Sequence, residues 1–207
     1  MTDPGPGAGL RVGVLALQGA FREHVAALRR LGAETVEVRA PGDLDGLDAL
    51  VLPGGESTAI DRLLDSSGLR TPLVEALEAG LPAFGTCAGL IVLGAGAEDG
   101  RADQRTLGVI DVTTRRNGYG SQVHSFEADV RLRGDGGDGP MPGVFIRAPR
   151  IVRIGPAVEV IGTLDGEPVV AAAGGIMVAS FHPELTGDDR LHRRFLERVH
   201  VARTVVA

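Results

Sequence analysis

The sequence predicts an α/β fold: a three-layer, doubly wound, mostly parallel sheet with helices on both faces and an antiparallel extension in the second half. In the first half, short apolar runs alternate with segments whose apolar residues recur at helical spacing, which is typical of a parallel sheet with crossover helices. After Gly108, short apolar runs follow one another without helical segments between them, which indicates antiparallel strands.

The first half supplies the predicted parallel strands and their covering helices. Residues 11–17 (RVGVLAL) are apolar almost throughout, as expected of a strand that is buried on both faces. Apolar residues at helical spacing predict a helix over 21–31, and Gly32 ends it. The other elements expected here are strands at 35–39 and 47–52, helices at 60–64 and 72–79, and a strand that runs into Cys87.

The second half supplies the antiparallel strands and a last helix. Its glycine-rich segment 134–143 is expected to form a loop. We expect a single domain over residues 10–207, preceded by a flexible Pro- and Gly-rich tail over residues 1–9. The elements expected here are strands at 109–112, 126–132, 144–147, 158–164, 169–173 and 176–181, and a helix at 188–201.

Composition excludes several classes of function. The net charge is −6, and no basic stripe indicates a nucleic-acid partner. No apolar stretch approaches the ~20 residues of a membrane span, and a single cysteine forms no internal disulfide, which favours the cytoplasm. The chain lacks a Cys/His cluster or HExxH, so no metal is expected, and the absence of GxGxxG gives no support for a dinucleotide cofactor.

The single cysteine, Cys87, lies between two apolar segments and has small neighbours (GTCAGL). This pattern is typical of a sharp strand-to-helix turn with a nucleophile at its apex, because bulky neighbours would clash there. The positive end of the following helix would favour the thiolate. Taken alone, the pattern also fits a buried structural cysteine.

A histidine and a carboxylate follow another apolar run, in the segment SFHPEL. His182 and Glu184 have the same parity in an extended segment, so both side chains can face one side. Glu184 can then accept from one imidazole nitrogen while the other nitrogen points at a thiol, as in a catalytic triad. A strand-terminal turn with a solvated glutamate is the alternative.

A glycine pair, Gly54-Gly55, follows a third apolar run (LPGGES). Consecutive glycines let backbone amides turn toward a ligand, as an oxyanion hole requires, although Pro-Gly-Gly alone commonly marks only a turn. All three motifs end a predicted buried strand, and such strand ends meet at one edge of a parallel sheet. Histidines expected instead on solvated helix faces are His24, His192 and His200.

The motifs FGTCAGL, LPGGES and SFHPEL together resemble those of the class I, triad-type glutamine amidotransferases. With LALQGAFREH, RNGYGSQ and VFIRAP, they are similar to the family of glutaminase subunits of pyridoxal 5′-phosphate synthase. The resemblance runs from Leu10 to Val201. The ordered set LQG, GGES, IRAP and HPE is far more specific than GxCxG alone.

The resemblance implies that Cys87, His182 and Glu184 hydrolyse L-glutamine to L-glutamate and ammonia, without cofactor or metal. It implies a synthase subunit of pyridoxal 5′-phosphate synthase as the protein partner, which uses the ammonia with ribose 5-phosphate and glyceraldehyde 3-phosphate. Backbone amides of Gly54, Gly55 and Ala88 are the implied oxyanion hole.

The resemblance also implies contacts with substrate and partner. Glutamine is a zwitterion, so its site needs a cationic contact and an anionic or acceptor contact. Gln18 matches a family position that faces the synthase, near the oxyanion region. Taken alone, Arg116 would also fit a solvated arginine at a strand end. The implied substrate-binding residues are Gly55, Glu56, Ser57, Arg116, Ile146 and Arg147.

Two segments depart from the family pattern. Tyr119-Gly120-Ser121-Gln122 stands where many relatives have Phe-Gly-Arg-Gln, so an arginine contact is missing. The loop Gly134–Gly143 is longer than usual. Both bear on the interface with the synthase and not on the triad.

Three alternatives remain open at this stage. A glutaminase that serves another synthase, such as that of imidazole glycerol phosphate, would keep the triad but lack the LQG and IRAP segments. A non-catalytic glutamine-binding regulatory module would be free to lose triad residues, which are all present here. Thiol peptidases and stress proteins of the related α/β superfamily have histidine directly after the cysteine, where this chain has Ala88.

Overall fold

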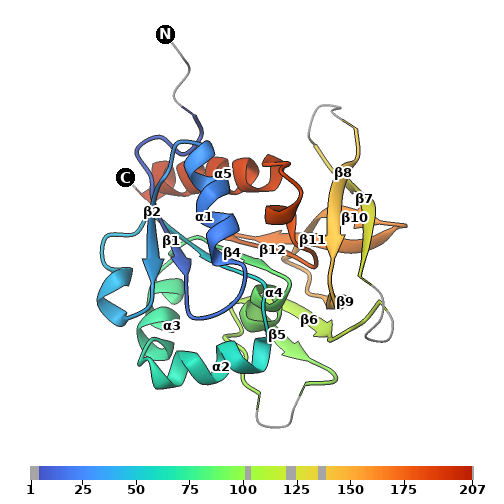
Figure 1. Cartoon of the computed structure of the whole chain (residues 1–207), viewed down its shortest axis with the longest axis horizontal. Helices are drawn as coiled ribbons and strands as arrows, with labels where there is room; N and C mark the ends of the chain where they lie inside the picture. The colour runs from blue at the N-terminus through green and yellow to red at the C-terminus, as the bar shows by residue number, and fades with distance from the viewer. Residues whose placement is uncertain (1–4, 101–103, 120–124, 135–138, 207) are drawn as a thin grey trace.

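The computed structural model of the chain describes residues 5–100, 104–119, 125–134 and 139–206, and it has the predicted α/β architecture (Figure 1). Its central sheet contains nine strands within these ranges. They are β1 (Arg11–Leu15), β2 (Glu34–Val38), β3 (Ala49–Leu52), β4 (Ala83–Thr86), β7 (Phe126–Leu132), β8 (Met141–Phe145), β10 (Glu159–Leu164), β11 (Glu167–Ala173) and β12 (Ile176–Ala179). Their order in the sheet is β2-β1-β3-β4-β12-β11-β10-β7-β8.

One half of the central sheet is parallel and the other half is antiparallel. β1 pairs in parallel with β2 and β3, β3 with β4, and β4 with β12. From β12 through β11, β10 and β7 to β8, each strand is antiparallel to the next. Parallel neighbours need long crossovers, which the helices supply, whereas the antiparallel strands follow one another through shorter connections. The predicted doubly wound sheet with an antiparallel extension is confirmed.

A second, three-stranded sheet corrects one expectation. The strand predicted at 109–112 is β6 (Ile110–Arg115), and it does not extend the central sheet. It pairs in parallel with β5 (Gly94–Ala97) and antiparallel with β9 (Arg150–Ile154), two strands that the sequence did not indicate. The sequence of β5 is GAGA, which has none of the β-branched or aromatic residues that favour strands.

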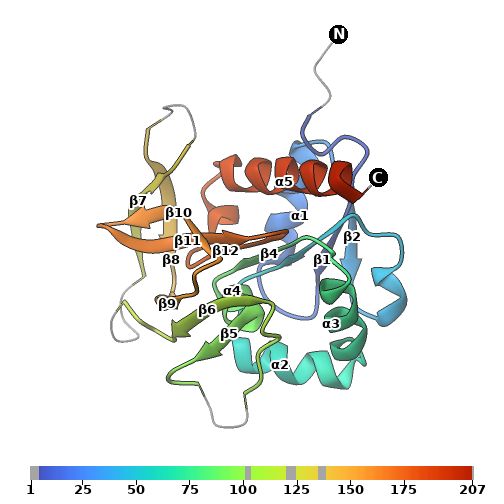
Figure 2. The ribbon, with the colours of Figure 1, turned by 180° about the vertical axis from the view of Figure 1, so that it is seen from behind.

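Helices cover both faces of the central sheet, as Figures 1 and 2 show from opposite sides. The helices are α1 (Phe21–Arg30), α2 (Ser57–Ser66), α3 (Arg70–Glu78), α4 (Ala88–Leu93) and α5 (Arg190–Val206), with short 3-10 turns η1 (Pro41–Leu44) and η2 (Pro183–Leu185). Alternate side chains of β3 point to opposite faces of the sheet and so into the two different helical layers. Val51 packs in one core cluster with residues of α1 and α5, whereas Leu50 and Leu52 pack in the other with residues of α2, α3 and α4.

Two histidines expected on solvated helix faces are buried instead. His24 on α1 and His192 on α5 are both 0% exposed, so that prediction was wrong. His192 lies three and four residues before the buried Phe195 and Leu196, a spacing that places all three on the inner face of α5. His200 is exposed, as expected.

The described part of the expected tail, residues 5–9, lies against the end of α1 and against α5. The Gly7 N–H donates to the Leu31 carbonyl at 2.9 Å, just beyond α1. The His200 Nε2 on α5 lies 2.9 Å from the Pro6 carbonyl oxygen. In the part of the chain that the structure describes, no helix is both long and apolar enough to cross a membrane.

Candidate active site

Three adjacent parallel strands deliver the predicted catalytic motifs to one edge of the sheet. β4 pairs with β3 on one side and with β12 on the other, so the carboxyl ends of all three strands lie together. Gly54 follows β3, Cys87 follows β4 and His182 follows β12. The Cys87 N–H donates to the Ala179 carbonyl at 2.9 Å, which ties the cysteine to the end of β12.

Cys87 occupies a strained turn between β4 and α4. Its backbone has φ 48° and ψ −103°, a conformation that L-residues rarely adopt. The neighbouring glycines make this turn possible. A Cβ on Gly89 would lie 2.1 Å from the Leu52 carbonyl oxygen, and one on Gly85 would lie 2.7 Å from the Gly89 backbone. The small residues around Cys87 are therefore required by close packing.

His182 is held between the cysteine and a buried carboxylate. Its Nδ1 lies 2.7 Å from Glu184 Oε1, and its backbone N–H donates to the Val144 carbonyl at 2.9 Å. Burial opposes protonation of the imidazole. Hydrogen bonds to Cys87 and Glu184, and the electrostatic attraction that both exert on the imidazolium, outweigh burial and raise the pKa of His182 to about 10.

Glu184, in η2, has a side chain that is 0% exposed. Burial alone would raise its pKa, but His24 and the hydrogen bond from His182 outweigh it and keep the pKa below the ordinary value. The Glu184 carboxylate is therefore ionised, and it accepts a hydrogen bond from the protonated Nδ1 of His182. This fixes the Nε2 of His182 as the nitrogen available to exchange a proton with the thiol.

A cavity of about 350 Å³ opens in front of Cys87. Its wall includes every residue that the resemblance assigned to substrate binding, and also Gln18 and Ala88. Glu184 lies behind it. Two residues that the sequence did not single out, Ile91 and Asn117, also belong to the wall. The lining residues are Gln18, Gly55, Glu56, Ser57, Cys87, Ala88, Ile91, Arg116, Asn117, Ile146, Arg147 and His182.

Opposite charges from two different elements meet at the cavity wall. Arg116 Nη2, beyond β6, lies 3.0 Å from Glu56 Oε1. Glu56 also caps α2, where its carboxylate accepts from the N–H groups of Thr58 and Ala59 at 3.1 and 2.7 Å. Partial burial opposes ionisation, but these bonds and the charge of Arg116 lower the pKa of Glu56. The cavity wall thus carries this pair of opposite charges, and a second arginine, Arg147, also lines it.

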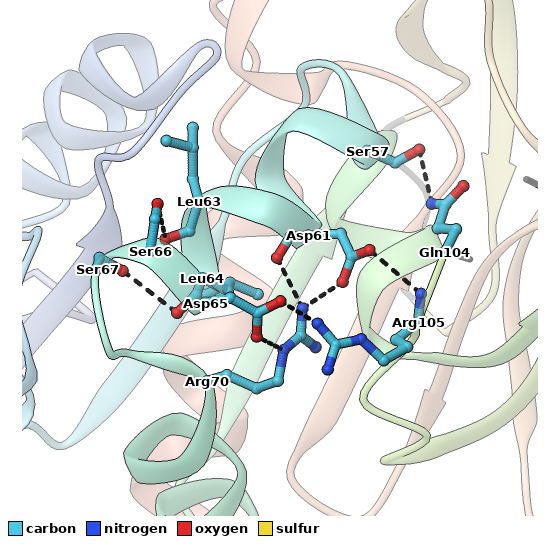
Figure 3. A network of polar contacts seen from close by, with 10 residues as sticks. All are labelled: Ser57, Asp61, Leu63, Leu64, Asp65, Ser66, Ser67, Arg70, Gln104 and Arg105. Atoms are coloured by element: carbon cyan, nitrogen blue, oxygen red, sulfur yellow. Dashed lines mark hydrogen bonds and ion pairs between the residues drawn. The ribbon is translucent and has the colours of Figure 1, made fainter.

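A polar network lies along α2 (Figure 3), and one of its members, Gln104, contacts Arg116. Gln104 accepts from Arg116 Nη1 at 3.2 Å and donates to Ser57 Oγ at 3.0 Å. The next residue, Arg105, pairs with Asp65 and donates its backbone N–H to Asp61 at 3.3 Å. The figure shows Arg70 between the same two aspartates, with its Nε 2.6 Å from Asp65. Nothing in the sequence motifs pointed to Gln104.

The predicted oxyanion hole needs one correction. The Gly54 N–H donates to Thr86 Oγ1 at 3.1 Å and not into the cavity, so this amide is not available to an oxyanion in this structure. Gly55 and Ala88 do line the cavity. The Gln18 side chain accepts from the Glu56 N–H at 2.8 Å and so fixes the glycine loop beside it.

Backbone strain concentrates at this cavity. Within the described ranges, four residues other than glycine have a positive φ, and Cys87, Asn117 and Arg147 of these line the cavity. Such strain is common at functional sites.

In the described ranges no group of three His, Cys, Asp or Glu side chains is arranged to hold a metal ion. Of the two segments that depart from the family pattern, residues 120–122 and 135–138 lie outside the described residues, and residues 141–143, which were expected in the loop, belong to β8.

A cysteine, a histidine and a buried carboxylate at the carboxyl edge of a doubly wound sheet define a triad-type thiol enzyme of the α/β class. The comparisons with known proteins agree with this class. The chain belongs to the SNO glutamine amidotransferase family, whose model matches residues 14–201. The resemblance drawn from the motifs is thereby confirmed.

Curated relatives and solved structures are similar over nearly the whole chain. A protein of Salinispora arenicola named "Pyridoxal 5′-phosphate synthase subunit PdxT" is 50% identical, covering 92% of this chain and 97% of its own. One of Acidothermus cellulolyticus with the same name is 52% identical, covering 91% and 93%. A crystal structure titled as a glutamine amidotransferase has TM-score 0.85 and 49% identity, covering 91% and 98%. PurLQS from Thermotoga maritima, with TM-score 0.64 and 16% identity over 96% and 99%, shares the fold.

Proposed function

We propose that this chain is the glutaminase subunit of a pyridoxal 5′-phosphate synthase and hydrolyses L-glutamine to L-glutamate and ammonia. The observation that carries the proposal is the chain of contacts from Cys87 through His182 to Glu184, on a cavity that also holds the Glu56–Arg116 pair. Family membership and the name of the relatives support the same assignment.

The first chemical step forms an acyl-enzyme. With the Cys87 proton held on His182, as the raised pKa of the imidazole favours, the sulfur attacks the side-chain amide carbon of glutamine. The carbon–sulfur bond forms and the carbon–nitrogen bond breaks. The proton held by His182 goes to the leaving nitrogen, so ammonia departs and a γ-glutamyl thioester remains. Glu184 stabilises the imidazolium that exists between these two proton transfers.

The second step releases glutamate. His182 takes a proton from water, the hydroxide attacks the thioester carbon, the carbon–sulfur bond breaks, and the proton held by His182 passes to the departing sulfur of Cys87. Each step passes through a tetrahedral oxyanion, for which the N–H groups of Gly55 and Ala88 at the cavity wall are our candidate donors. One such donor is worth on the order of 10²-fold in rate.

Arg116 and Glu56 are the proposed recognition groups for the amino-acid end of glutamine. The α-carboxylate of glutamine pairs with the Arg116 guanidinium, and its α-ammonium pairs with the Glu56 carboxylate. Substrate binding therefore replaces the ion pair that Arg116 and Glu56 form with each other in the free site. Gly55, Ser57, Ile146 and Arg147 complete the wall around the substrate.

We further propose a hetero-oligomer with the synthase subunit, which receives the ammonia in the cytoplasm. Gln18 is our candidate for a residue at this interface, because it lies at the cavity wall and holds the Glu56 amide. A contact there would act directly on the loop that carries Gly55. We expect the isolated chain to be nearly inactive and the synthase subunit to switch it on.

The test is glutamate and ammonia release from L-glutamine by the wild type and Cys87→Ala, each with and without the synthase subunit from the same genome. Cys87→Ala should lose activity by at least about 10³-fold while its circular dichroism and unfolding midpoint stay unchanged. Activity that depends on a different added synthase would favour the alternative glutaminase. Glutamine binding without hydrolysis in every condition would favour a non-catalytic binding module.

A further inference from the structure

Two buried histidines extend the triad into the helical layer. His24 Nε2 lies 3.3 Å from Glu184 Oε2, the carboxylate oxygen that does not face His182. On its other side, His24 Nδ1 lies 2.9 Å from His192 Nε2. Both histidines are 0% exposed, and they come from α1 and α5. A continuous line of polar side chains therefore runs from Cys87 to His192.

The hydrogen bonds fix where the protons lie along this line. His24 Nε2 is also 3.1 Å from Thr86 Oγ1, which already accepts from the Gly54 N–H. A lone pair on Nε2 would face the Glu184 carboxylate oxygen, which electrostatics disfavours, so Nε2 carries the proton. His24 Nδ1 is then an acceptor, and His192 donates its Nε2–H to it.

This arrangement leaves only one unpaired atom on the two rings among the described residues, His192 Nδ1, and it is an acceptor. The opposite arrangement would leave a buried N–H donor without a partner, which is costly. Burial lowers the pKa of both histidines, that of His192 to about 3, so both rings are neutral. Charges acting on them are those of Glu23, Glu184, His182, Asp189 and Arg30.

We propose that His24, oriented by His192, is a positioning residue of the triad: its Nε2–H, which is hydrogen-bonded to Thr86 Oγ1, lies 3.3 Å from the rear oxygen of Glu184 and attracts it, so that the front oxygen stays aligned with His182. Glu184 Oε2 has no hydrogen-bonding partner among the described residues, and the His24 Nε2–H lies 3.3 Å from it. Without that dipole the buried carboxylate would lose ionisation and orientation together. This inference rests on the proposed triad.

The test uses alkylation of Cys87 by iodoacetamide, which needs neither glutamine nor a partner. Because the chain has one cysteine, the alkylation rate of the folded protein reports Cys87 alone. The matched pair is His24→Gln and His24→Asn. The glutamine amide can place an N–H where Nε2 lies, whereas the shorter asparagine amide reaches only the Nδ1 position. His24→Leu removes both, and His200→Gln on the exposed face of α5 is the control.

We expect His24→Leu and His24→Asn to slow alkylation at pH 7 by about 10-fold or more, the size of effect that is common when a group that orients a functional side chain is removed. Their rate profiles should move to higher pH. His24→Gln and His200→Gln should stay within about 3-fold of the wild type. If circular dichroism shows that His24→Leu does not fold, the comparison of His24→Gln with His24→Asn tests the proposal on its own.

Equal rates and profiles in folded His24→Asn and His24→Gln would overturn the proposal, because it requires an N–H at the Nε2 position, which only the glutamine can supply. A wild-type profile no different from that of a free thiol would overturn it together with the triad. Absence of glutaminase activity, combined with the expected alkylation pattern, would remove only the proposed function and leave the positioning role standing.

Discussion

Gly54 gives a steric test of how accurately His182 must be placed. A Cβ built on Gly54 would lie 2.2 Å from His182 Cε1 and 2.8 Å from its Nδ1. Gly54 is not among the glycines with a positive φ, so alanine fits its backbone without strain there. The substitution Gly54→Ala therefore acts mainly on the imidazole, which must move away from the new methyl group, with a smaller contact to Cys87 Cβ at 3.2 Å.

The size of the displacement follows from van der Waals contact. Restoring Cε1 to about 3.5 Å from the methyl carbon requires a shift of about 1.3 Å. The 2.7 Å hydrogen bond to Glu184 cannot survive a shift of that size in the same geometry. Misplacement of a catalytic group by about 1 Å costs on the order of 10²-fold in rate. We expect kcat for glutamine hydrolysis, measured with the synthase subunit present, to fall by about that factor.

The matched control is Gly42→Ala in η1, where a new Cβ meets nothing within 4 Å. It should keep wild-type kcat and KM. Urea unfolding of both variants separates a displaced ring from a damaged fold. A folded Gly54→Ala with wild-type kcat would refute the reasoning, because it would show that the imidazole works from a displaced position.

Three further predictions concern substrate binding, the elbow and pH. Arg116→Gln should raise KM for glutamine by about 10- to 100-fold with kcat nearly unchanged, since it removes a charged contact made throughout the reaction; an unchanged KM in steady-state assays would contradict this. Gly89→Ala should lower the free energy of unfolding by about 1–3 kcal/mol, because its Cβ would lie 2.1 Å from the Leu52 carbonyl oxygen; an unchanged urea midpoint would contradict the packing. His192 binds its proton with a pKa of 6.5 when unfolded but about 3 when folded, so acid favours unfolding between these values. Its contribution to stability should fall by ~2 kcal/mol from pH 7 to pH 5, and the loss should shrink by that amount in His192→Leu.

The triad and its place at the sheet edge followed from local patterns. Each catalytic motif ends an apolar run, and the carboxyl ends of parallel strands meet by topology, so the sequence predicted that Cys87 and His182 come together. The same logic placed Gly55 at the cavity. These features are local in sequence, and the fold brings them together through regular strand pairing.

What the sequence did not predict depends on contacts between distant elements. The burial of His24 depends on α5 lying beside α1, and nothing in either helix alone reveals that packing. The Gly54 amide was assigned to the oxyanion, but its partner Thr86 comes from the next strand of the sheet. Gln104 contacts Ser57 and Arg116 across long sequence separations, and no motif marks it. Strand β5 was missed because its four residues carry no strand signal.

The most direct test of the central claim is labelling by a diazoketone analogue of L-glutamine, followed by mass spectrometry of the peptides. With the synthase subunit present, the account predicts one label per chain, carried by the peptide with Cys87, blocked by excess L-glutamine and absent from Cys87→Ala. Labelling of a different residue, or labelling of Cys87 that L-glutamine does not prevent, would contradict it, because the thiol and the glutamine site would then be separate.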